Sequence, residues 1–346
     1  MKKINLKNRD LLKMLDFTGD EINYLIDLSI KMKKDRDTSR AKKLASKKPI
    51  VLIFQKTSTR TRCSFETASY ELGIGCTCLD PNTAQFGKKE STADTAKVLS
   101  KFYQGIEFRG YKQSDVEELA KYADVPVWNG LTDFSHPTQM IADMMTIKEE
   151  YGKLKGLNLV FLGDGRFNIG NSLMVTCSKL GINYTCVAPK QFWADKKLLD
   201  QCKEFARKSG STIKFVEPKD KLSAVRNAQV IYTDIWVSMG EPESSWNERL
   251  SLMGPCQVDM KTMKAALVGN KKGTIFMHCL PAYHGKDTEV GRWVAEKFGK
   301  KYPVVANGEC EVTDDVVVSK YSRCFEEAGN RMHSIKAIVY ATLGGK

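Results

Sequence analysis

The side chains best suited to chemistry stand in residues 58–62, whose sequence is STRTR and which follow the apolar run 49–54. That run is short and rich in β-branched residues, which is typical of a buried parallel strand. The next stretch places Phe65 and Leu72 on one helical face and ends before Gly73, which predicts a helix. The motif would then lie at a helix N-terminus, where free backbone N–H groups, hydroxyls and guanidiniums suit a phosphate group. A capped helix start with a solvated basic turn is the alternative that the spacing leaves open.

Polar residues also follow other predicted strands. Arg109 and His136 do so in the first half of the chain, and Asn168, Asp234 and Cys279 do so in the second half. Ligands of open α/β sheets bind beyond the carboxyl ends of the strands. We therefore expect these side chains to line a cleft between two domains.

Three of these residues allow more than one interpretation. His136 precedes a proline that suits a helix start, so it is either structural or a hydrogen-bond donor to a developing oxyanion. Cys279 is either a nucleophile or a buried thiol, and the sequence shows no general base beside it. The turn 163–170, GDGRFNIG, invites a dinucleotide-binding interpretation, but Asn168 stands where the third glycine is required. A polar turn that presents Asn168 to the cleft is the preferred interpretation.

Short apolar runs alternate with helical patterns along the chain, which predicts parallel sheets covered by helices on both faces. In the first half, we expect strands at 50–54, 75–79, 106–109 and 125–128, and helices at 92–103, 115–122 and 138–151. A boundary at 153–156 precedes strands expected at 157–162, 184–187, 213–216, 230–233 and 274–277. The predicted fold is α/β, with two doubly wound parallel-sheet domains at 1–150 and 151–318 and an active-site cleft between them. A helix over 319–343 is expected to pack back on the first domain, which the segment 319–346 completes.

Composition supports a globular protein of two domains. The 346 residues exceed one ordinary core, and the mixture of 42% hydrophobic and 27% charged residues is that of a soluble chain. No apolar run approaches the length of a membrane span and the N-terminus lacks a signal peptide, so we expect a cytoplasmic protein without membrane contact. The ten cysteines form neither a disulfide framework nor a zinc-site spacing, which indicates reduced thiols.

The net charge of +13 raises nucleic acid as a partner. The one dense basic block, residues 31–48, holds nine lysines and arginines against two aspartates, hence a charge of +7. It contains no aromatic residues and no known nucleic-acid-binding module. A solvated surface is therefore the preferred interpretation, and no nucleic acid partner is expected.

Four motifs together resemble the aspartate/ornithine carbamoyltransferases, and their order and spacing agree over nearly the whole chain. They are STRTR at 58–62, FRG at 108–110, HPTQ at 136–139 and HCLP at 278–281. The SMG element at 238–240 and the cysteine of HCLP resemble the ornithine branch of the family. Phe167 departs from the family pattern, in which this position of the Asn168 turn is often polar.

The resemblance implies transfer of the carbamoyl group of carbamoyl phosphate to the δ-amine of L-ornithine, which gives L-citrulline and phosphate without a metal or organic cofactor. It implies that carbamoyl phosphate contacts Ser58, Thr59, Arg60, Thr61, Gln85, Arg109, His136, Gln139, Cys279, Leu280 and Arg331. It implies that ornithine contacts Asn168, Asp234, Ser238 and Met239. Arg109, His136 and Cys279 would be the catalytic residues, with Cys279 orienting the attacking amine rather than bonding to it.

The resemblance also implies a homotrimer, or a larger assembly of trimers, in which the loop that carries Gln85 enters the active site of a neighbouring subunit. Other interpretations stay open: a carbamoyltransferase for another amine such as putrescine, an acetylated ornithine or aspartate, a nucleic-acid-binding protein, and an inactive scaffold. The direction of the reaction, towards the synthesis or the breakdown of arginine, is also open.

Overall fold

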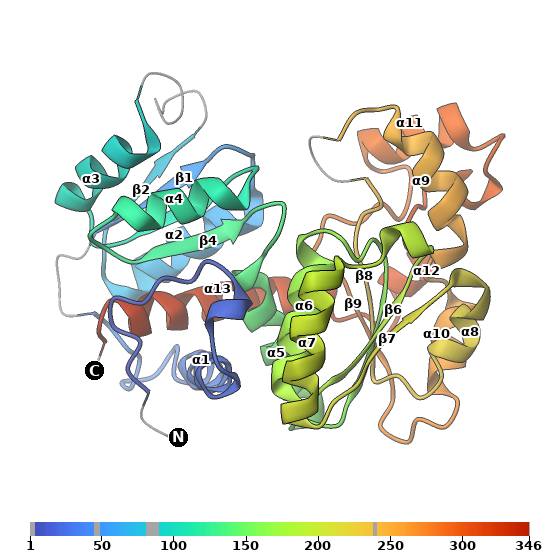
Figure 1. Ribbon diagram of the computed structural model, residues 1–346, viewed down its shortest axis with the longest axis horizontal. Coiled ribbons are helices and arrows are strands. Elements are labelled where there is room, and N and C mark those ends of the chain that lie inside the picture. Colours follow the sequence, from blue (N-terminus) through green and yellow to red (C-terminus); the bar gives the residue numbers. More distant parts are fainter. Residues whose placement is uncertain (1–3, 45–48, 81–89, 238–240, 346) are drawn as a thin grey trace. The chain divides into compact units, whose positions relative to one another are not determined.

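The computed structural model describes residues 4–44, 49–80, 90–237 and 241–345 of the chain, and Figure 1 shows its ribbon. The chain divides into two compact units. Unit 1 comprises Met1–Gly152 and Ala328–Lys346, and unit 2 comprises Lys153–Glu327. Each unit is built around its own sheet of parallel strands, which confirms the predicted fold class. No helix within the described ranges is long and apolar enough to span a membrane.

Unit 1 contains a four-stranded sheet with the strand order β2-β1-β3-β4. Its strands are β1 (Ile50–Phe54), β2 (Cys76–Leu79), β3 (Ile106–Arg109) and β4 (Val127–Leu131). Its helices are α1 (Gly19–Lys34), α2 (Thr59–Leu72), α3 (Thr92–Phe102), α4 (Gln113–Tyr122) and α5 (Pro137–Tyr151). The C-terminal helix α13 (Cys324–Thr342) belongs to this unit from Ala328 onward.

The two faces of the unit 1 sheet follow from the alternation of side chains along each strand. On one face, apolar residues of β1 and β3 such as Ile53 and Phe108 pack with apolar residues of α3 and α4. On the opposite face, the ring of Trp128 lies 6.0 Å from the ring of Phe65 in α2, and its indole N–H donates to the hydroxyl of Thr342 in α13 at 3.0 Å. Helices α2 and α13 therefore cover the second face.

Unit 2 contains a five-stranded sheet with the strand order β7-β6-β5-β8-β9. Its strands are β5 (Asn158–Leu162), β6 (Asn183–Val187), β7 (Ile213–Val216), β8 (Val230–Thr233) and β9 (Ile275–Met277). Its helices are α6 (Asn168–Leu180), α7 (Lys196–Ser209), α8 (Lys221–Ala224), α9 (Ser245–Met253), α10 (Met260–Leu267), α11 (Glu289–Phe298) and α12 (Asp314–Val317). Helices α6 and α7 lie side by side on one face of this sheet, and α8 and α10 lie together on the other (Figure 1).

The fourth strand differs from its predicted position. It was expected at 125–128, but β4 runs over Val127–Leu131. The Val127 N–H donates to the carboxylate of Asp10 at 2.8 Å, and the polar Asn129 still pairs with Phe108 of β3. Both contacts come from segments that are remote in sequence, so the apolar pattern alone placed the strand too early.

The final helix begins five residues later than predicted, at Cys324 rather than at residue 319. The segment before it runs alongside β9, where the Phe276 N–H donates to the Tyr321 carbonyl at 2.8 Å and the Arg323 N–H donates to the Phe276 carbonyl at 2.9 Å. A backbone paired with a strand cannot also make helical hydrogen bonds, so the helix starts after this pairing ends.

All ten cysteines lie in the described ranges as free thiols, and six of them are buried. Burial raises the pKa of the Cys256 thiol to about 12, so this thiol stays protonated at neutral pH. The predicted reduced state of the cysteines agrees with this arrangement.

The described part of the basic block, residues 31–44, makes ion pairs within unit 1. Lys33 pairs with Glu149 at 2.9 Å, and Arg36 pairs with Glu71 at 2.6 Å. Residues 45–48 of the block lie outside the described ranges. Because carboxylates of the same unit neutralise part of the block, these contacts favour the interpretation as an ordinary protein surface.

His333 of α13 gives unit 1 a specific sensitivity to acid. Its side chain is 7% exposed, and burial lowers its pKa to about 4, with the nearby charges of Lys336, Lys33 and Arg36 acting in the same direction. The folded state therefore keeps this imidazole neutral, whereas the unfolded chain protonates it below about pH 6.5. Stability that is present above pH 6.5 is accordingly lost as the pH falls towards 4.

We expect His333→Gln to remove this loss, which amounts to at most about 3 kcal/mol between pH 7 and pH 4. Urea unfolding followed by circular dichroism at several pH values measures it. The unfolding free energy of the parent should fall more steeply than that of the variant as the pH falls. Parallel curves over this pH range would contradict the assignment.

Candidate active site

The turn between β1 and α2 has the strand–turn–helix geometry predicted for residues 58–62. Ser58 is the N-cap of α2, and its hydroxyl oxygen accepts the backbone N–H of Thr61 at 3.2 Å. Gly73 ends the helix with a φ of 74°, a left-handed conformation that glycine adopts without steric cost. The other N–H groups of the first turn and the positive end of the helix therefore lie beyond the carboxyl end of β1, an arrangement that favours an anion.

Thr61, in the first turn of α2, lies at the centre of a buried cluster in unit 1. Its hydroxyl oxygen accepts a hydrogen bond from Nη2 of Arg331 at 3.1 Å and lies 3.4 Å from Nη1 of Arg109. Nη1 of Arg331 donates to Oε1 of Gln139 and lies 3.4 Å from Nε2 of His136. The structure thus brings together five residues predicted for the carbamoyl phosphate site, from α2, β3, α5 and α13.

The remaining motif residues of α2 are more accessible than this cluster. Thr59 is exposed, and Ser58 and Arg60 are half-buried. The positive charge of Arg60 acts on His136, where it lowers the pKa of the imidazole. The N-terminus of α2 therefore carries accessible hydroxyl and guanidinium groups in front of a buried cationic cluster.

His136 is held as a neutral imidazole. It is the N-cap of α5 with Pro137 directly after it, as predicted, and its ring is 3% exposed. Burial lowers the pKa of His136 well below its usual range, and the charges of Arg331 and Arg109 act in the same direction. Nδ1 lies 3.4 Å from the hydroxyl of Thr138. A neutral ring beside two guanidiniums can donate one hydrogen bond to a carbonyl oxygen without adding a further charge.

Asp143 is a part of this cluster that the sequence analysis missed. Its carboxylate accepts a hydrogen bond from Nε2 of Gln139 at 2.8 Å, one helical turn away on α5. This bond directs the amide oxygen of Gln139 towards Arg331. The sequence feature that could have identified Asp143 is its spacing of four residues from Gln139, which places two polar side chains on the same face of a largely buried helix.

In unit 2, Asp234 and Cys279 lie together as predicted. Asp234 directly follows β8, and Cys279 follows β9 by two residues. The Cys279 thiol lies 3.3 Å from Oδ1 of Asp234, to which it donates. Burial raises the pKa of Asp234, against the effect of His278, the Ile235 N–H and the Cys279 thiol, which lower it. A partly desolvated carboxylate of this kind binds an ammonium group more strongly than an exposed one.

The turn after β9 is held rigidly by His278. Its Nδ1 accepts the backbone N–H of Leu280 at 2.9 Å, and its Nε2 lies 3.2 Å from the carboxylate of Glu311. Leu280 has a φ of 55°, a left-handed conformation that is uncommon for a leucine. Glu327 accepts the His278 backbone N–H at 3.1 Å. Two buried glutamates that the sequence analysis did not identify thus fix the turn that carries Cys279.

Asp234, His278 and Cys279 have ligand-type atoms within 4.8 Å of one another, an arrangement that could hold a metal ion. Both ring nitrogens of His278 already have hydrogen-bond contacts, to the Leu280 N–H and to Glu311. The Cys279 thiol is likewise directed at Asp234. These side chains therefore hold one another in place.

The remaining predicted residues for ornithine are only partly described. Asn168 is the first residue of α6 and is half-buried, and Phe167 is the N-cap. The departure at Phe167 has a structural reason, since the guanidinium carbons of Arg166 and Arg249 lie 5.4 and 5.7 Å from the centre of its ring. Three predicted site residues, Gln85, Ser238 and Met239, lie outside the described ranges.

A buried ion-pair network stabilises the turn that begins α6. Arg249 of α9 donates to Asp164 and also to Glu241, the latter at 2.7 Å. Asp164 accepts two further hydrogen bonds from the Arg166 side chain, at 2.7 and 2.9 Å. Both guanidiniums lie 4.6 Å from the ring centre of Phe192. The network links α9 to the turn that carries Asn168.

We expect Arg249→Met to lower the free energy of unfolding by about 3 kcal/mol, because removal of one partner from a buried ion pair leaves the other charge undercompensated. Chemical denaturation measures the loss. Arg207→Met is the matched control, since Arg207 is 72% exposed on α7 and pairs with Glu204, and it should change stability by less than about 0.5 kcal/mol. Equal effects of the two changes would contradict a structural role of the network.

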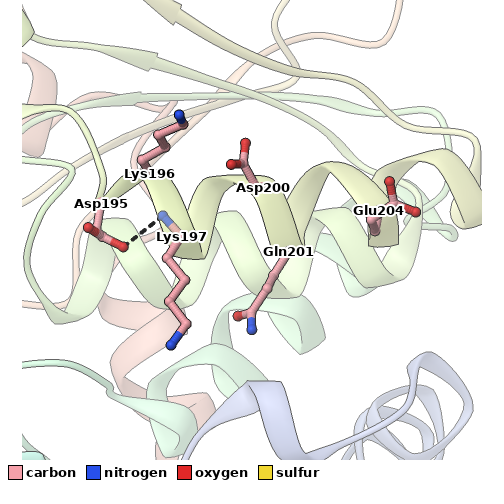
Figure 2. Close-up of a pocket in the computed structure, with 6 residues that line it drawn as sticks. All are labelled: Asp195, Lys196, Lys197, Asp200, Gln201 and Glu204. Atoms are coloured by element: carbon pink, nitrogen blue, oxygen red, sulfur yellow. Dashed lines mark hydrogen bonds between the residues drawn. The ribbon is translucent and has the colours of Figure 1, made fainter.

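A separate surface pocket lies along the N-terminal half of α7 (Figure 2). Its walls are the polar side chains Asp195, Lys196, Lys197, Asp200, Gln201 and Glu204. Asp195 is the N-cap of the helix and accepts the Lys197 N–H at 2.9 Å. This pocket contains none of the predicted site residues, and its side chains have the charge pattern of a solvated helix face.

Comparison with known proteins identifies the family of each half of the chain. Residues 9–149 match the family model of the carbamoyl-P binding domain of aspartate/ornithine carbamoyltransferase, and residues 155–342 match that of its Asp/Orn binding domain. The second match includes the whole of α13, which belongs to unit 1 from Ala328 onward.

Full-length relatives carry the same family name. The chain is 49% identical to the catabolic ornithine carbamoyltransferase of Treponema denticola, covering 98% of this chain and 96% of the relative. It is 50% identical to the catabolic ornithine carbamoyltransferase of Mycoplasma pneumoniae, covering 99% of each. The solved structure of ornithine carbamoyltransferase from Pyrococcus furiosus has a TM-score of 0.86 and 38% identity, covering 99% of this chain and 100% of that one. The chain therefore belongs to the aspartate/ornithine carbamoyltransferase family.

Proposed function

We propose that this chain is an ornithine carbamoyltransferase, which transfers the carbamoyl group of carbamoyl phosphate to L-ornithine. The neutral δ-amine nitrogen attacks the carbamoyl carbon, a C–N bond forms, and the C–O bond to phosphate breaks. The amine loses one proton, which the departing phosphate takes up, and the products are L-citrulline and inorganic phosphate. The observation that carries this proposal is the convergence of Arg109 and Arg331 on Thr61 at the N-terminus of α2, with neutral His136 beside Arg331.

The N-terminus of α2 supports binding of the phosphate group. Ser58, Thr59 and Arg60 offer hydroxyl and guanidinium donors at a helix end whose dipole favours an anion. Arg331 adds a second guanidinium from α13. These groups would stabilise the phosphate more strongly as it departs, because its charge grows when the C–O bond breaks.

The buried cluster supports polarisation of the carbamoyl group. Arg109, His136 and Thr61 would surround the carbonyl oxygen, where negative charge develops during attack. Gln139 would accept a hydrogen bond from the carbamoyl NH₂ group, since Asp143 and Arg331 fix the orientation of its amide. Hydrogen bonds among these side chains hold them in place before substrate arrives, which reduces the cost of reorganisation.

The amino-acid end of ornithine has a counterpart in unit 2. We assign Asp234 to the α-ammonium group, and Cys279 with the Leu280 carbonyl to the orientation of the attacking amine. Asn168, Ser238 and Met239 are assigned to the remaining contacts with ornithine. Putrescine lacks an α-carboxylate and an acetylated ornithine lacks the α-ammonium, so this set of residues favours ornithine over both. The predicted cleft between the domains stays a prediction.

We also propose a cytoplasmic homotrimer, or an assembly of trimers, with shared active sites. The family relationship supports the trimer, and the free thiols support a reducing compartment. If Gln85 enters a neighbouring site, inactive Gln85 and Arg60 variants should regain part of their activity when their subunits are mixed. No recovery in mixed trimers would count against shared sites.

The cellular direction of the reaction depends on the concentrations of its four reactants, because one site catalyses both directions. The relatives from Treponema denticola and Mycoplasma pneumoniae are named catabolic. In that direction citrulline and phosphate would be consumed and carbamoyl phosphate released.

The experiment that tests the proposal measures the carbamoylated product of carbamoyl phosphate with four amines in parallel: L-ornithine, putrescine, N-acetylornithine and L-aspartate. We expect turnover with ornithine and a kcat/KM for the other amines at least about tenfold lower, which corresponds to about 1.4 kcal/mol in transition-state binding. Preference for another amine would overturn the assignment of Asp234. No turnover with any amine would overturn the proposed activity.

A further inference from the structure

Glu107 occupies a position in the sheet of unit 1 where a charged residue is unexpected. It lies in the middle of β3, paired with Leu52 of β1 and Trp128 of β4, and its side chain is 0% exposed. Because side chains alternate along a strand, Glu107 shares with Arg109 the face opposite the apolar residue Phe108. It is therefore on the face that α2 and α13 cover, next to the predicted carbamoyl phosphate site.

The fold leaves space for the Glu107 side chain at a glycine. A Cβ atom at Gly130 of β4 would collide with a carboxyl oxygen of Glu107, and it would lie 3.1 Å from the side-chain methyl of Thr61. The register between β3 and β4 shifts at this point, between Phe108 and Arg109. The carboxyl group and Thr61 thus border the same narrow space, and Gly130 provides the room for both.

The carboxyl group is surrounded but not hydrogen-bonded. Within the residues that the structure describes, neither oxygen of Glu107 has a hydrogen-bond partner. A buried carboxylate without donors loses its hydration without compensation, whereas a neutral carboxylic acid loses much less. Burial accordingly raises the pKa of Glu107 well above its usual range, while the charges of Arg109 and Arg331 oppose this effect.

We propose that Glu107 is a positioning residue, held as a neutral carboxylic acid behind the carbamoyl phosphate site, where it fills the space beside Gly130 and Thr61. In this form it does not neutralise Arg109 and Arg331, so both guanidiniums keep their full charge for the anionic substrate. The inference rests on the proposed role of Thr61, Arg109 and Arg331 in binding carbamoyl phosphate. An ionised Glu107 would instead repel the phosphate group and compete for its two cations.

Ionisation of Glu107 would make the binding of carbamoyl phosphate dependent on pH. A group with a raised pKa in the folded protein stays neutral at low pH and ionises as the pH rises. Ionisation of Glu107 should then raise the KM for carbamoyl phosphate on the alkaline side. The charged groups that act on Glu107 are Arg109 and Arg331. The thiols of Cys76 and Cys78 in β2 are the neighbouring titratable groups, and burial raises the pKa of both.

One further group near the site titrates at alkaline pH. Burial lowers the pKa of Lys56, with the charge of Arg109 acting in the same direction. Its loss of charge would also weaken the binding of an anion. Comparison of the parent with Glu107→Gln separates the ionisation of Glu107 from the deprotonation of Lys56, because the variant retains Lys56 and lacks only the carboxyl group.

The first test compares Glu107→Gln and Glu107→Ala with the parent by steady-state kinetics between pH 6 and pH 10. We expect Glu107→Gln to keep the KM for carbamoyl phosphate within about threefold near neutral pH and to lose part of its alkaline rise. Glu107→Ala should raise this KM at least about tenfold, because Thr61 and Arg109 lose their packing. A tenfold higher KM for Glu107→Gln at every pH would show that the site needs the ionised carboxylate, and would overturn the proposal.

The second test does not depend on activity. Infrared difference spectra of parent and Glu107→Gln at neutral pH should show loss of one carbonyl stretching band of a protonated carboxylic acid. Glu117→Gln is the control, since hydrogen bonds from Lys13 and Gln113 lower the pKa of Glu117 despite partial burial, and it should leave this band unchanged. Retention of the band in Glu107→Gln would overturn the proposal. Loss of the band in a protein that carbamoylates no amine would uphold the neutral acid and reject the proposed function alone.

Discussion

Replacement of Arg331 by methionine should lower kcat/KM for carbamoyl phosphate by about 10³-fold. The guanidinium of Arg331 contacts Thr61, Thr138, His136 and Gln139. Loss of a single preorganised donor to a developing charge costs about 10²- to 10³-fold, and this change also removes the group that orients several others. The effect should be expressed in both KM and kcat, because Arg331 is assigned to the phosphate before and after the C–O bond breaks.

Steady-state kinetics with carbamoyl phosphate as the varied substrate measures this effect. Arg207→Met serves again as the control, since it removes the same charge from an exposed position on α7. Circular dichroism should show that the variant is folded. A loss smaller than about fivefold would exclude Arg331 from the phosphate site.

The second large effect is expected at Asp234. Asp234→Asn should lower kcat/KM for L-ornithine by about 10²-fold or more, because a charge-assisted contact between a partly buried carboxylate and an ammonium group is lost. The Kd for carbamoyl phosphate should stay the same, since Asp234 is assigned only to the amine substrate. Asp200→Asn is a suitable control, because the Asp200 side chain is 56% exposed.

N-acetylornithine adds a decisive comparison for Asp234. It lacks the α-ammonium group, so Asp234→Asn should scarcely change its low rate of use. The difference in transition-state binding between the two amines should therefore shrink in the variant. An equal loss of activity with both amines would show that Asp234 acts elsewhere than at the α-ammonium group.

The sequence predicted the parts of the fold whose determinants are local. The strand–turn–helix arrangement of β1 and α2 follows from an apolar run, an N-cap serine and a C-terminal glycine, all within 25 residues or so of chain. The start of α5 at His136 and Pro137 is equally local. The predicted bounds of β4 and the predicted start of α13 were wrong because contacts with segments remote in sequence decide them, namely those of β4 with Asp10 and Phe108 and that of the segment before α13 with Phe276.

The same distinction applies to the site. The residues of the motifs are present in the sequence, but only the fold shows that Arg331 lies against Thr61, 270 positions earlier in the chain. The polar residues behind the motifs, such as Asp143, Glu311 and Glu107, gave no signal strong enough to single them out. Their roles follow from contacts between neighbouring strands and helices, which hydrophobic periodicity does not encode.

The most direct test of the account is the stoichiometry of a single reaction mixture. Carbamoyl phosphate labelled with ¹³C at the carbonyl is incubated with L-ornithine and the protein, and NMR follows the labelled carbonyl and the phosphorus together. We expect citrulline and inorganic phosphate in equal amounts with the parent protein, and at limiting carbamoyl phosphate both should form about 10³-fold more slowly with Arg331→Met. Phosphate released without citrulline, or an undiminished rate with Arg331→Met, would contradict the proposed carbamoyl transfer at this site.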